Sequence, residues 1–290
     1  MKLNHYLATA GVCSRRNAAE LVKEGHVTIN GAITREPWFE VLDKHIVAVD
    51  GKPVKPVAKI YVLMNKPKNC VSTVSDDEGR KTVVEMLYPQ IKERMFPVGR
   101  LDQMTTGLLV LTNDGELSQR LAHPRYEIQK VYEVMLDRPL ADHDFKKIEQ
   151  GLFLDGSRVN VDSISPVSPR NKSFLRVTIH SGKYRVVRRI FESLGYFVKS
   201  LDRVAYAFLN QRELPVGRWR YLTAGEVKRL LSMSASRQKG NTRCNDVHCD
   251  KKTQELCDGK KVQVSCVGKK SRVCRDREKT SVCRIRKKSQ

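Results

Sequence analysis

The pattern of hydrophobic and polar positions predicts a small unit of two helices and a sheet at the start of the chain. Apolar residues recur at helical spacing up to Ala10, and Ser14 can cap a second helix that ends at Gly25. The next segment alternates between apolar and polar residues and turns at Asn30-Gly31 and at Asp50-Gly51, which are strong hairpin signals. The beginning of the chain therefore predicts one compact domain.

A longer segment of strands and helices is predicted from residue 60 onward. The stretch GKPVKPVAK before it contains two prolines and three lysines, which is typical of a short semi-rigid linker. The turn Asn65-Lys66-Pro67 is expected to end the first strand. The pattern predicts strands over 60–64, 107–112, 130–134, 174–180 and 197–204, and helices over 116–122, 142–150 and 184–194. The predicted parts of the chain are a domain at 1–52, a linker at 53–59, a second domain at 60–232 and a tail at 233–290.

Asp102 stands in a turn-prone GRLD segment shortly before the predicted strand at 107–112. A carboxylate that a buried strand holds in place has the fixed geometry that a nucleophile or a general base requires. The alternative is a loop aspartate that accepts hydrogen bonds from its own turn. Asp114, the nearest other carboxylate, lies in an Asn-Asp-Gly turn and is explained by that turn. Asp102 is therefore the candidate catalytic residue.

The predicted helix at 184–194 presents its arginines on different faces. Its buried face is defined by four apolar residues, Val187, Ile190, Phe191 and Leu194. At about 100° per residue, Arg188 lies about 110° from the middle of that face, whereas Arg185 and Arg189 lie roughly 150° or more away. Arg188 is therefore the arginine expected to run along the core and to present its guanidinium to an interior site.

The strongly positive net charge of the chain points to a polyanionic partner. The sequence contains 54 Lys and Arg against 32 Asp and Glu, a formal net charge of +22. RNA, DNA and an anionic membrane surface would all match this charge. No window approaches the run of about 20 apolar residues that a membrane span needs, and the start has no apolar leader. We therefore expect a soluble, cytoplasmic protein, in which Cys13 and Cys70 are reduced thiols.

The predicted tail differs in composition from the rest of the chain. From residue 237 onward it contains 17 Lys and Arg against 6 Asp and Glu, with almost no aromatic residues. This composition predicts disorder and RNA binding without sequence preference. Its six cysteines recur without a CxxC pair, so metal binding by Cys244, His248 and Cys249 is not expected. The two predicted domains contain no motif for a metal, a nucleotide or a dinucleotide cofactor either.

Two stretches resemble the bacterial ribosomal RNA pseudouridine synthases that carry an S4-type RNA-binding domain at the N-terminus. GRLD followed by TTGLLVLTNDG resembles their catalytic signature, and AGVCSRRNAAELVKEGHVTINGAI resembles the S4-type domain. The resemblance implies that Asp102 is the catalytic residue. It also implies that Arg15, Arg16 and Lys23 line an RNA-binding face that reads backbone and shape. A solvated basic helix face would show the same charge pattern.

Further motifs extend the resemblance to about residue 232. In KVYEV, Tyr132 matches a tyrosine that stacks on the target uracil, and in YRVVRR, Arg188 matches a basic residue that pairs with the catalytic aspartate. Val186 stands where that family frequently has glutamine. Leu201 matches a leucine that lines the uracil pocket, and Arg100 matches an arginine that helps fill the space left by a flipped base. Packing in a hydrophobic core would also explain a tyrosine or a leucine at these positions.

The resemblance implies an α+β fold, in which a small S4-type domain is joined to a synthase domain built on a largely antiparallel mixed sheet. It implies isomerisation of a specific uridine in ribosomal RNA without a cofactor, and we expect a monomer that binds ribosomal RNA or a ribosomal precursor particle. The stretch LAHPRYEIQKVYEV is more similar to members that modify large-subunit RNA. The alternative is a non-catalytic S4-type RNA-binding or ribosome-assembly protein. An ordinary glycosidase is disfavoured because it uses two carboxylates and GRLD offers one.

Overall fold

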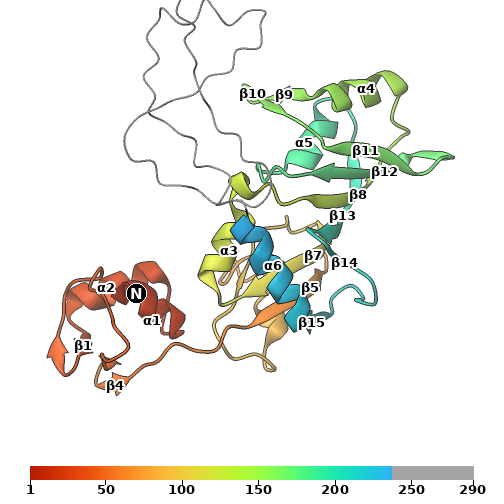
Figure 1. The fold of residues 1–290 in the computed structure, drawn as a ribbon. Coiled ribbons are helices and arrows are strands. Elements are labelled where there is room, and N and C mark those ends of the chain that lie inside the picture. Colours follow the sequence, from red (N-terminus) through yellow and green to blue (C-terminus); the bar gives the residue numbers. More distant parts are fainter. Residues whose placement is uncertain (237–290) are drawn as a thin grey trace, which may run out of the picture. The chain divides into compact units, whose positions relative to one another are not determined.

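The computed structural model describes residues 1–236 of the chain (Figure 1). The second domain ends in helix α6, Ala224–Ser236, so the helix continues past residue 232, where the sequence placed the start of the tail. The predictions of disorder, RNA binding and no metal site for the rest of the tail lie outside the described residues. Of the helices in residues 1–236, none combines the length and the apolar character that a membrane span requires.

Two helices and a four-stranded sheet form the N-terminal unit, as predicted. Helix α1, Leu3–Thr9, packs against α2, Arg15–Glu24, and the side chain of Ser14 caps α2 by accepting a backbone hydrogen bond. Gly25 ends α2 in the left-handed conformation, at φ 90°. Both predicted hairpin turns are present, each with positive φ at its two turn residues. The strands, in the sheet order β2-β1-β3-β4, are β1 Val27–Ile29, β2 Ala32–Ile33, β3 Val47–Val49 and β4 Lys52–Pro53.

The second unit is built on one mixed sheet in the order β11-β12-β8-β13-β7-β5-β15, with β14 paired to β13 and β6 paired to β7. The pairing of β13 with β7 is parallel and the others are antiparallel, which confirms the predicted largely antiparallel mixed sheet. Its strands are β5 Tyr61–Lys66, β6 Phe96–Pro97, β7 Thr106–Thr112, β8 Lys130–Leu136, β11 Ser163–Ser168, β12 Asn171–Ile179, β13 Val198–Tyr206, β14 Leu209–Asn210 and β15 Trp219–Tyr221. A separate hairpin consists of β9 Leu152–Leu154 and β10 Ser157–Val159, and the helices are α3 Gly115–Ala122, α4 Asp142–Gln150, α5 Val186–Glu192 and α6, with 3₁₀ turns η1 Glu85–Leu87 and η2 Pro124–Tyr126.

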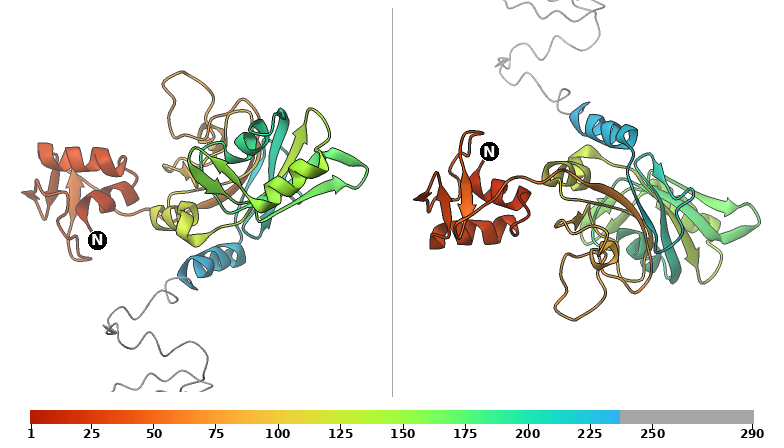
Figure 2. Two further views of the ribbon diagram at one scale, coloured as in Figure 1. Left: turned by 90° about the horizontal axis from the view of Figure 1, so that it is seen from above. Right: turned by 90° about the horizontal axis from the view of Figure 1, so that it is seen from below.

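Both faces of the central strand β7 are buried. Leu108 and Val110 belong to a core cluster with α3 and α6, which lie side by side (Figures 1 and 2). Leu109 and Leu111 belong to a second cluster that includes residues of α4 and α5. Because both faces are buried, β7 has a continuous apolar sequence instead of an alternating one. This rigid strand begins directly after the loop that contains the candidate catalytic aspartate.

Several predicted boundaries are wrong, among them the end of β5 and the start of α5. Strand β5 continues through Asn65 and Lys66, where the sequence predicted a turn, and both residues pair with β7. Their polar side chains can be buried because their N–H groups donate hydrogen bonds to backbone carbonyls. Asn65 Nδ2, for example, donates to the carbonyl of Leu214 at 2.8 Å. Helix α5 begins two residues later than predicted because Arg185 adopts a left-handed conformation, at φ 46°. The hairpin of β9 with β10 and strand β11 were not predicted at all.

Gly107 should be required for the junction of β7 with β13. It pairs with Arg203 and has φ 112°, and a Cβ there would lie 2.4 Å from the backbone nitrogen of Arg203. We expect Gly107→Ala to lower the free energy of unfolding by about 3 kcal/mol or more, because strain and a backbone clash add. Urea unfolding followed by circular dichroism measures the loss.

Gly115→Ala is the matched control, because a Cβ at Gly115 meets no atom within 4 Å and the residue starts α3. The control should stay within about 1 kcal/mol of the wild type. Equal stability of the two variants would contradict the tight approach of β7 to β13.

Candidate active site

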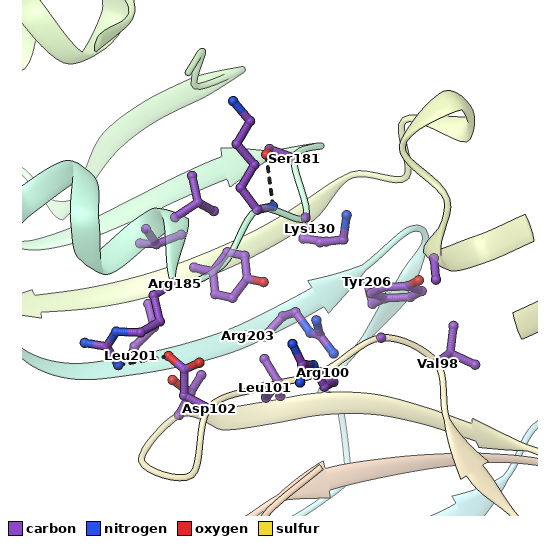
Figure 3. Close-up of a pocket in the computed structure, with 18 residues that line it drawn as sticks. Val98, Arg100, Leu101, Asp102, Lys130, Ser181, Arg185, Leu201, Arg203 and Tyr206 are labelled. Carbon is purple, nitrogen blue, oxygen red and sulfur yellow. Dashed lines mark hydrogen bonds and ion pairs between the residues drawn. The ribbon is translucent and has the colours of Figure 1, made fainter. Parts of the chain in front are cut away.

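A cavity of about 140 Å³ opens where the loop before β7 meets strands β8 and β13 (Figure 3). Four residues that the sequence singled out line it, namely Arg100, Asp102, Tyr132 and Leu201. Residues of the segment at 181–187, which leads into α5, also line it. The fold therefore brings together residues from four separate stretches of the chain.

Hydrogen bonds hold the backbone on both sides of Asp102. The hydroxyl of Ser72 donates to the carbonyl of Leu101 at 3.0 Å and accepts from its backbone N–H at 3.2 Å. The backbone N–H of Thr105 donates to the carbonyl of Asp102 at 3.0 Å. The side chain of Asp102 nevertheless stays 30% exposed, so the carboxylate is held in place and accessible from the cavity.

Lys66 anchors the same loop from inside the protein. Its side chain is completely buried at the end of β5, and Nζ donates to the carbonyls of Pro67 at 2.9 Å, Gln103 at 3.1 Å and Thr105 at 2.9 Å. Burial lowers the pKa of this ammonium group to about 8, although the nearby Asp102 carboxylate acts in the opposite direction. Three carbonyl acceptors match the three N–H donors of a lysine, so the group is fully hydrogen-bonded.

Two arginines of the α5 region approach the carboxylate of Asp102. Arg188 is buried; its Nε lies 3.7 Å from Asp102 Oδ2, and its Nη1 donates to the carbonyl of Val198 at 3.1 Å. Arg185 Nη1 lies 3.4 Å from the same Oδ2, while its Nη2 reaches Glu192 at 3.2 Å. Burial and the neighbouring Arg185 lower the pKa of Arg188, and Asp102 raises it. Both guanidinium groups therefore face the same carboxylate oxygen of Asp102.

The prediction that Arg185 points away from the site is therefore wrong. That prediction treated residue 184 as the start of a regular helix. In the structure Arg185 precedes α5 in a left-handed conformation, so helical spacing does not govern the direction of its side chain. Arg188 lies inside α5 and is buried, as helical geometry predicted, and the structure places its Nε beside Asp102.

Tyr132 and Leu201 form an apolar wall of the cavity. Tyr132 lies on β8 and Leu201 on the neighbouring β13, and both are at least nine-tenths buried. Along β8, Tyr132, Val134 and Leu136 alternate with more exposed residues, as predicted. The structure thus presents an aromatic and an aliphatic side chain to whatever enters the cavity.

Two further cations reach the cavity from the same two strands. Lys130 donates to the carbonyls of Ile128 and His180, both at 3.0 Å, and burial lowers its pKa to about 8. Arg203 is almost completely buried and donates through Nε to the carbonyl of Leu108 at 2.7 Å. In Figure 3, Asp102 lies at one end of the cavity, and Lys130 and Arg203 lie toward the other.

Arg100 is exposed at the opening of the cavity and also borders a neighbouring cleft. Tyr184 and the polar loop at 75–80 line that cleft as well. Within the loop, Arg80 forms ion pairs with Asp76 at 2.7 Å and with Glu78 at 2.9 Å. The cleft therefore adjoins the cavity with charged side chains and one exposed aromatic ring.

Arg15, Arg16 and Lys23 do not belong to this cavity. All three are exposed on α2 of the N-terminal unit, and Arg15 and Arg16 are the first two residues of the helix. Cationic side chains and free N–H groups at a helix start both attract phosphate. Within residues 1–236, no three His, Cys, Asp or Glu side chains gather so as to hold a metal ion.

Sequence reasoning gave no site role to Lys66, Arg185 or Arg203. Lys66 was assigned to a turn, and its burial depends on carbonyls about forty residues away. Arg203 lies in the predicted strand at 197–204, which also contains Leu201. Its position inside a predicted strand, two residues after Leu201 and so on the same face, is a signal in the sequence that could have identified it, because an arginine inside a buried strand needs an explanation.

Comparisons with known proteins find relatives that cover most of the chain. Residues 60–193 match the family model described as RNA pseudouridylate synthase, and residues 1–47 match the S4 domain. A protein of Aquifex aeolicus called an uncharacterized RNA pseudouridine synthase is 40% identical over 79% of this chain and 93% of its own length. The ribosomal large subunit pseudouridine synthase B of Bacillus subtilis is 40% identical over 80% of this chain and 96% of its own length. A crystal structure titled pseudouridylate synthase matches with a TM-score of 0.57 and 26% identity, covering 79% of this chain and 99% of that one.

Replacing Lys66 should disturb both stability and the loop at 101–105. In Lys66→Met the three carbonyls lose their donor, which we expect to lower the free energy of unfolding by about 2 kcal/mol and the single-turnover rate by about 100-fold. Lys172→Met, which removes an exposed lysine paired with Asp142, is the control and should change neither value appreciably. A Lys66→Met enzyme with full activity would contradict the anchoring role.

The pKa of Lys66 also predicts how stability depends on pH. In the folded protein it is about 8 instead of the usual 10.5. Between these pH values the unfolded chain holds a proton at Lys66 that the folded chain has released, so this residue makes the free energy of unfolding rise with pH. We expect the stability of the wild type relative to Lys66→Met to rise from about pH 8 to about pH 10, measured by urea unfolding. Lys130 has the same shift but is present in both proteins, so a constant difference would contradict the prediction.

Proposed function

The chain belongs to the RNA pseudouridine synthase family with an N-terminal S4 domain, and we propose that it converts a specific uridine of large-subunit ribosomal RNA to pseudouridine with Asp102 as the catalytic residue. The observation that carries the proposal is the accessible carboxylate of Asp102, held by its loop and approached by Arg185 and Arg188 within 4 Å. The name of the relative in Bacillus subtilis supports the choice of the large subunit.

The reaction breaks the bond from N1 of uracil to C1′ of the ribose, turns the base and joins it again through C5. Asp102 can add to the base, attack C1′ or remove a proton from the sugar, and each route needs an ionised carboxylate at the junction of base and sugar. Arg185 and Arg188 contact Oδ2 of this carboxylate and orient it. The hydrogen bonds between Ser72 and the backbone of Leu101 hold Asp102 in place while charge develops on the substrate.

The target uridine must leave its helix to reach this carboxylate. We propose that the flipped uracil stacks on the ring of Tyr132 and contacts Leu201, because these two side chains form the apolar wall of the cavity. Arg100 at the opening is placed to occupy the space that the base leaves. An aromatic face on one side and a carboxylate at one end would hold the base and the sugar in a fixed relation.

Binding of the RNA around the target is assigned to the basic surfaces. The S4 domain binds RNA, and we propose that Arg15, Arg16 and Lys23 contact phosphates of ribosomal RNA, either free or in a precursor particle. The net charge of +22 supports strong, salt-dependent binding. The monomeric state and the cytoplasmic location expected from the sequence stay predictions.

Tritium release tests the proposal directly. Ribosomal RNA containing uridine tritiated at C5 loses that tritium when C5 bonds to the ribose. We expect release with the wild type and a fall of at least about 1,000-fold in Asp102→Asn, because an amide cannot replace the carboxylate. Asp43→Asn, which removes an exposed carboxylate of the N-terminal unit, is the control and should keep full activity.

The RNA substrates should include both ribosomal subunits, as naked RNA and as precursor particles. Release from large-subunit RNA alone would support the choice of subunit, and release from small-subunit RNA would overturn it. Tight binding without release from any substrate would favour the non-catalytic ribosome-assembly protein.

A further inference from the structure

Among residues 1–236, Arg203 is a buried cation without a counter-ion. It is 2% exposed, and within these residues the one hydrogen bond of its guanidinium runs from Nε to the carbonyl of Leu108 at 2.7 Å. Its Nη2 is buried and has no hydrogen-bond partner, and no Asp or Glu of the described residues forms an ion pair with it. Burying an unpaired charge costs several kcal/mol, so a protein keeps one only where something else uses it.

The position of Arg203 indicates which part of a bound ligand its guanidinium can contact. Arg203 lies opposite Tyr132 in the pairing of β13 with β8, and both residues line the same cavity. Side chains directly opposite each other on one face of an antiparallel pair lie in contact range. A base stacked on the ring of Tyr132 therefore has the guanidinium of Arg203 near its edge. The ring of Tyr206, 5.1 Å from the guanidinium carbon, supports Arg203 from another side.

The charges along the cavity are unevenly distributed. Asp102, with its arginines, lies at one end (Figure 3). Lys130 and Arg203 lie toward the other end, and each lacks a carboxylate partner in an ion pair among residues 1–236. The repulsion between them is visible in Lys130, whose pKa is lowered first by burial and then by Arg203. The cavity is thus arranged to hold a ligand that is neutral or becomes negative at that end.

We propose that Arg203 is a further catalytic residue, which donates a hydrogen bond from Nη2 to a carbonyl oxygen of the flipped uracil and stabilises the negative charge that forms on the ring. The inference rests on the proposed function, since it needs a uracil in the cavity. It assigns to Arg203 a hydrogen bond to the base that is distinct from the role of Asp102 on each of its possible routes.

The chemistry requires such a group on every route that Asp102 can take. When the bond from N1 to C1′ breaks, its electron pair stays on the uracil, and the charge spreads from N1 to the ring oxygens. If Asp102 instead adds to the ring, the charge also moves to a ring oxygen. The ring then bonds to C1′ through C5, loses the C5 proton and gains a proton at N1, so atoms and electrons balance. A donor placed where charge develops, in a site that excludes water, lowers the barrier.

A structural role for Arg203 makes the opposite prediction about stability. If the guanidinium served only to bond Leu108, an apolar side chain of similar length would lose that bond and weaken the fold. If the charge is kept for the substrate, the same replacement removes an unpaired buried cation and should leave stability equal or higher. Arg203→Met separates the two cases.

The experiment first measures wild-type turnover on the modified RNA, because an inactive wild type would refute the proposed function and not this inference in particular. In single turnover with saturating enzyme, we expect Arg203→Met to convert uridine about 100-fold more slowly than the wild type, with an unchanged or higher melting temperature. Arg203→Lys, which keeps the charge but not the geometry, should lie between them. Arg176→Met is the matched control; this exposed arginine of the neighbouring β12 pairs with Glu133 and should retain wild-type activity.

RNA with 5-fluorouridine at the target position provides a readout that a structural role would not move. Fluorine withdraws electrons and stabilises negative charge on the ring, so cleavage of the bond from N1 to C1′ needs less help from Arg203. Because 5-fluorouridine has no C5 proton to lose, only this cleavage is compared between the two substrates. We expect the rate deficit of Arg203→Met, followed as loss of the N1-linked nucleoside, to be about tenfold smaller on 5-fluorouridine than on uridine. The same deficit on both substrates, wild-type activity in Arg203→Met, or a marked loss of its stability would each overturn the inference.

Discussion

The geometry of the active site depends on one buried ammonium group. The loop at 101–105 has no regular secondary structure, so its carbonyls lack the partners that a strand or a helix would provide. Lys66 supplies them from the end of β5, where the sheet itself fixes the lysine backbone. Burial of a charged group opposes this arrangement, and three carbonyl dipoles offset that cost. The hydrogen bonds of Lys66 therefore attach the loop to the rigid sheet, and the loop in turn fixes the position of Asp102.

The same low-dielectric interior explains why so many cations surround a single carboxylate. In water each of these side chains would be screened, but inside the fold their fields add. Arg185 and Arg188 act on Asp102, whereas Lys130 and Arg203 act toward the base end of the cavity. Because the two pairs are separated by the length of the cavity, the first acts on the Asp102 carboxylate and the second on the charge that forms on the uracil ring. Preorganised charge of this kind lowers stability, which is the usual relation between a catalytic site and its scaffold.

Local signals in the sequence predicted the parts of the fold that depend on neighbours along the chain. The cap at Ser14, the glycine that ends α2, the hairpin turns and the apolar run of β7 were all predicted, as was the position of Arg188. The continuation of β5 through Lys66 was missed, because Asn-Lys-Pro is a common turn and its burial depends on distant carbonyls. Arg185 was misplaced for a related reason: one left-handed residue moved the start of a helix. The role of Arg203 rests on a guanidinium nitrogen that is buried without a hydrogen-bond partner, and that feature can be observed only in the structure.

The place where the site forms follows from how the sheet is joined. Strands β5 and β7 belong to one antiparallel half and strands β8, β12 and β11 to another, and the halves meet only at the parallel pairing of β7 with β13 within this sheet of residues 60–236. Because that pairing is short, the loop before β7 diverges from β13 directly beside it, which leaves room for a cavity between them. Gly107 permits the close approach because the backbone of Arg203 occupies the space that a Cβ atom at residue 107 would need. The contact that joins the two halves therefore also sets the distance between Asp102, on one half, and the residues that face the base, on the other. A change in that contact must alter catalysis even if every catalytic side chain is still present.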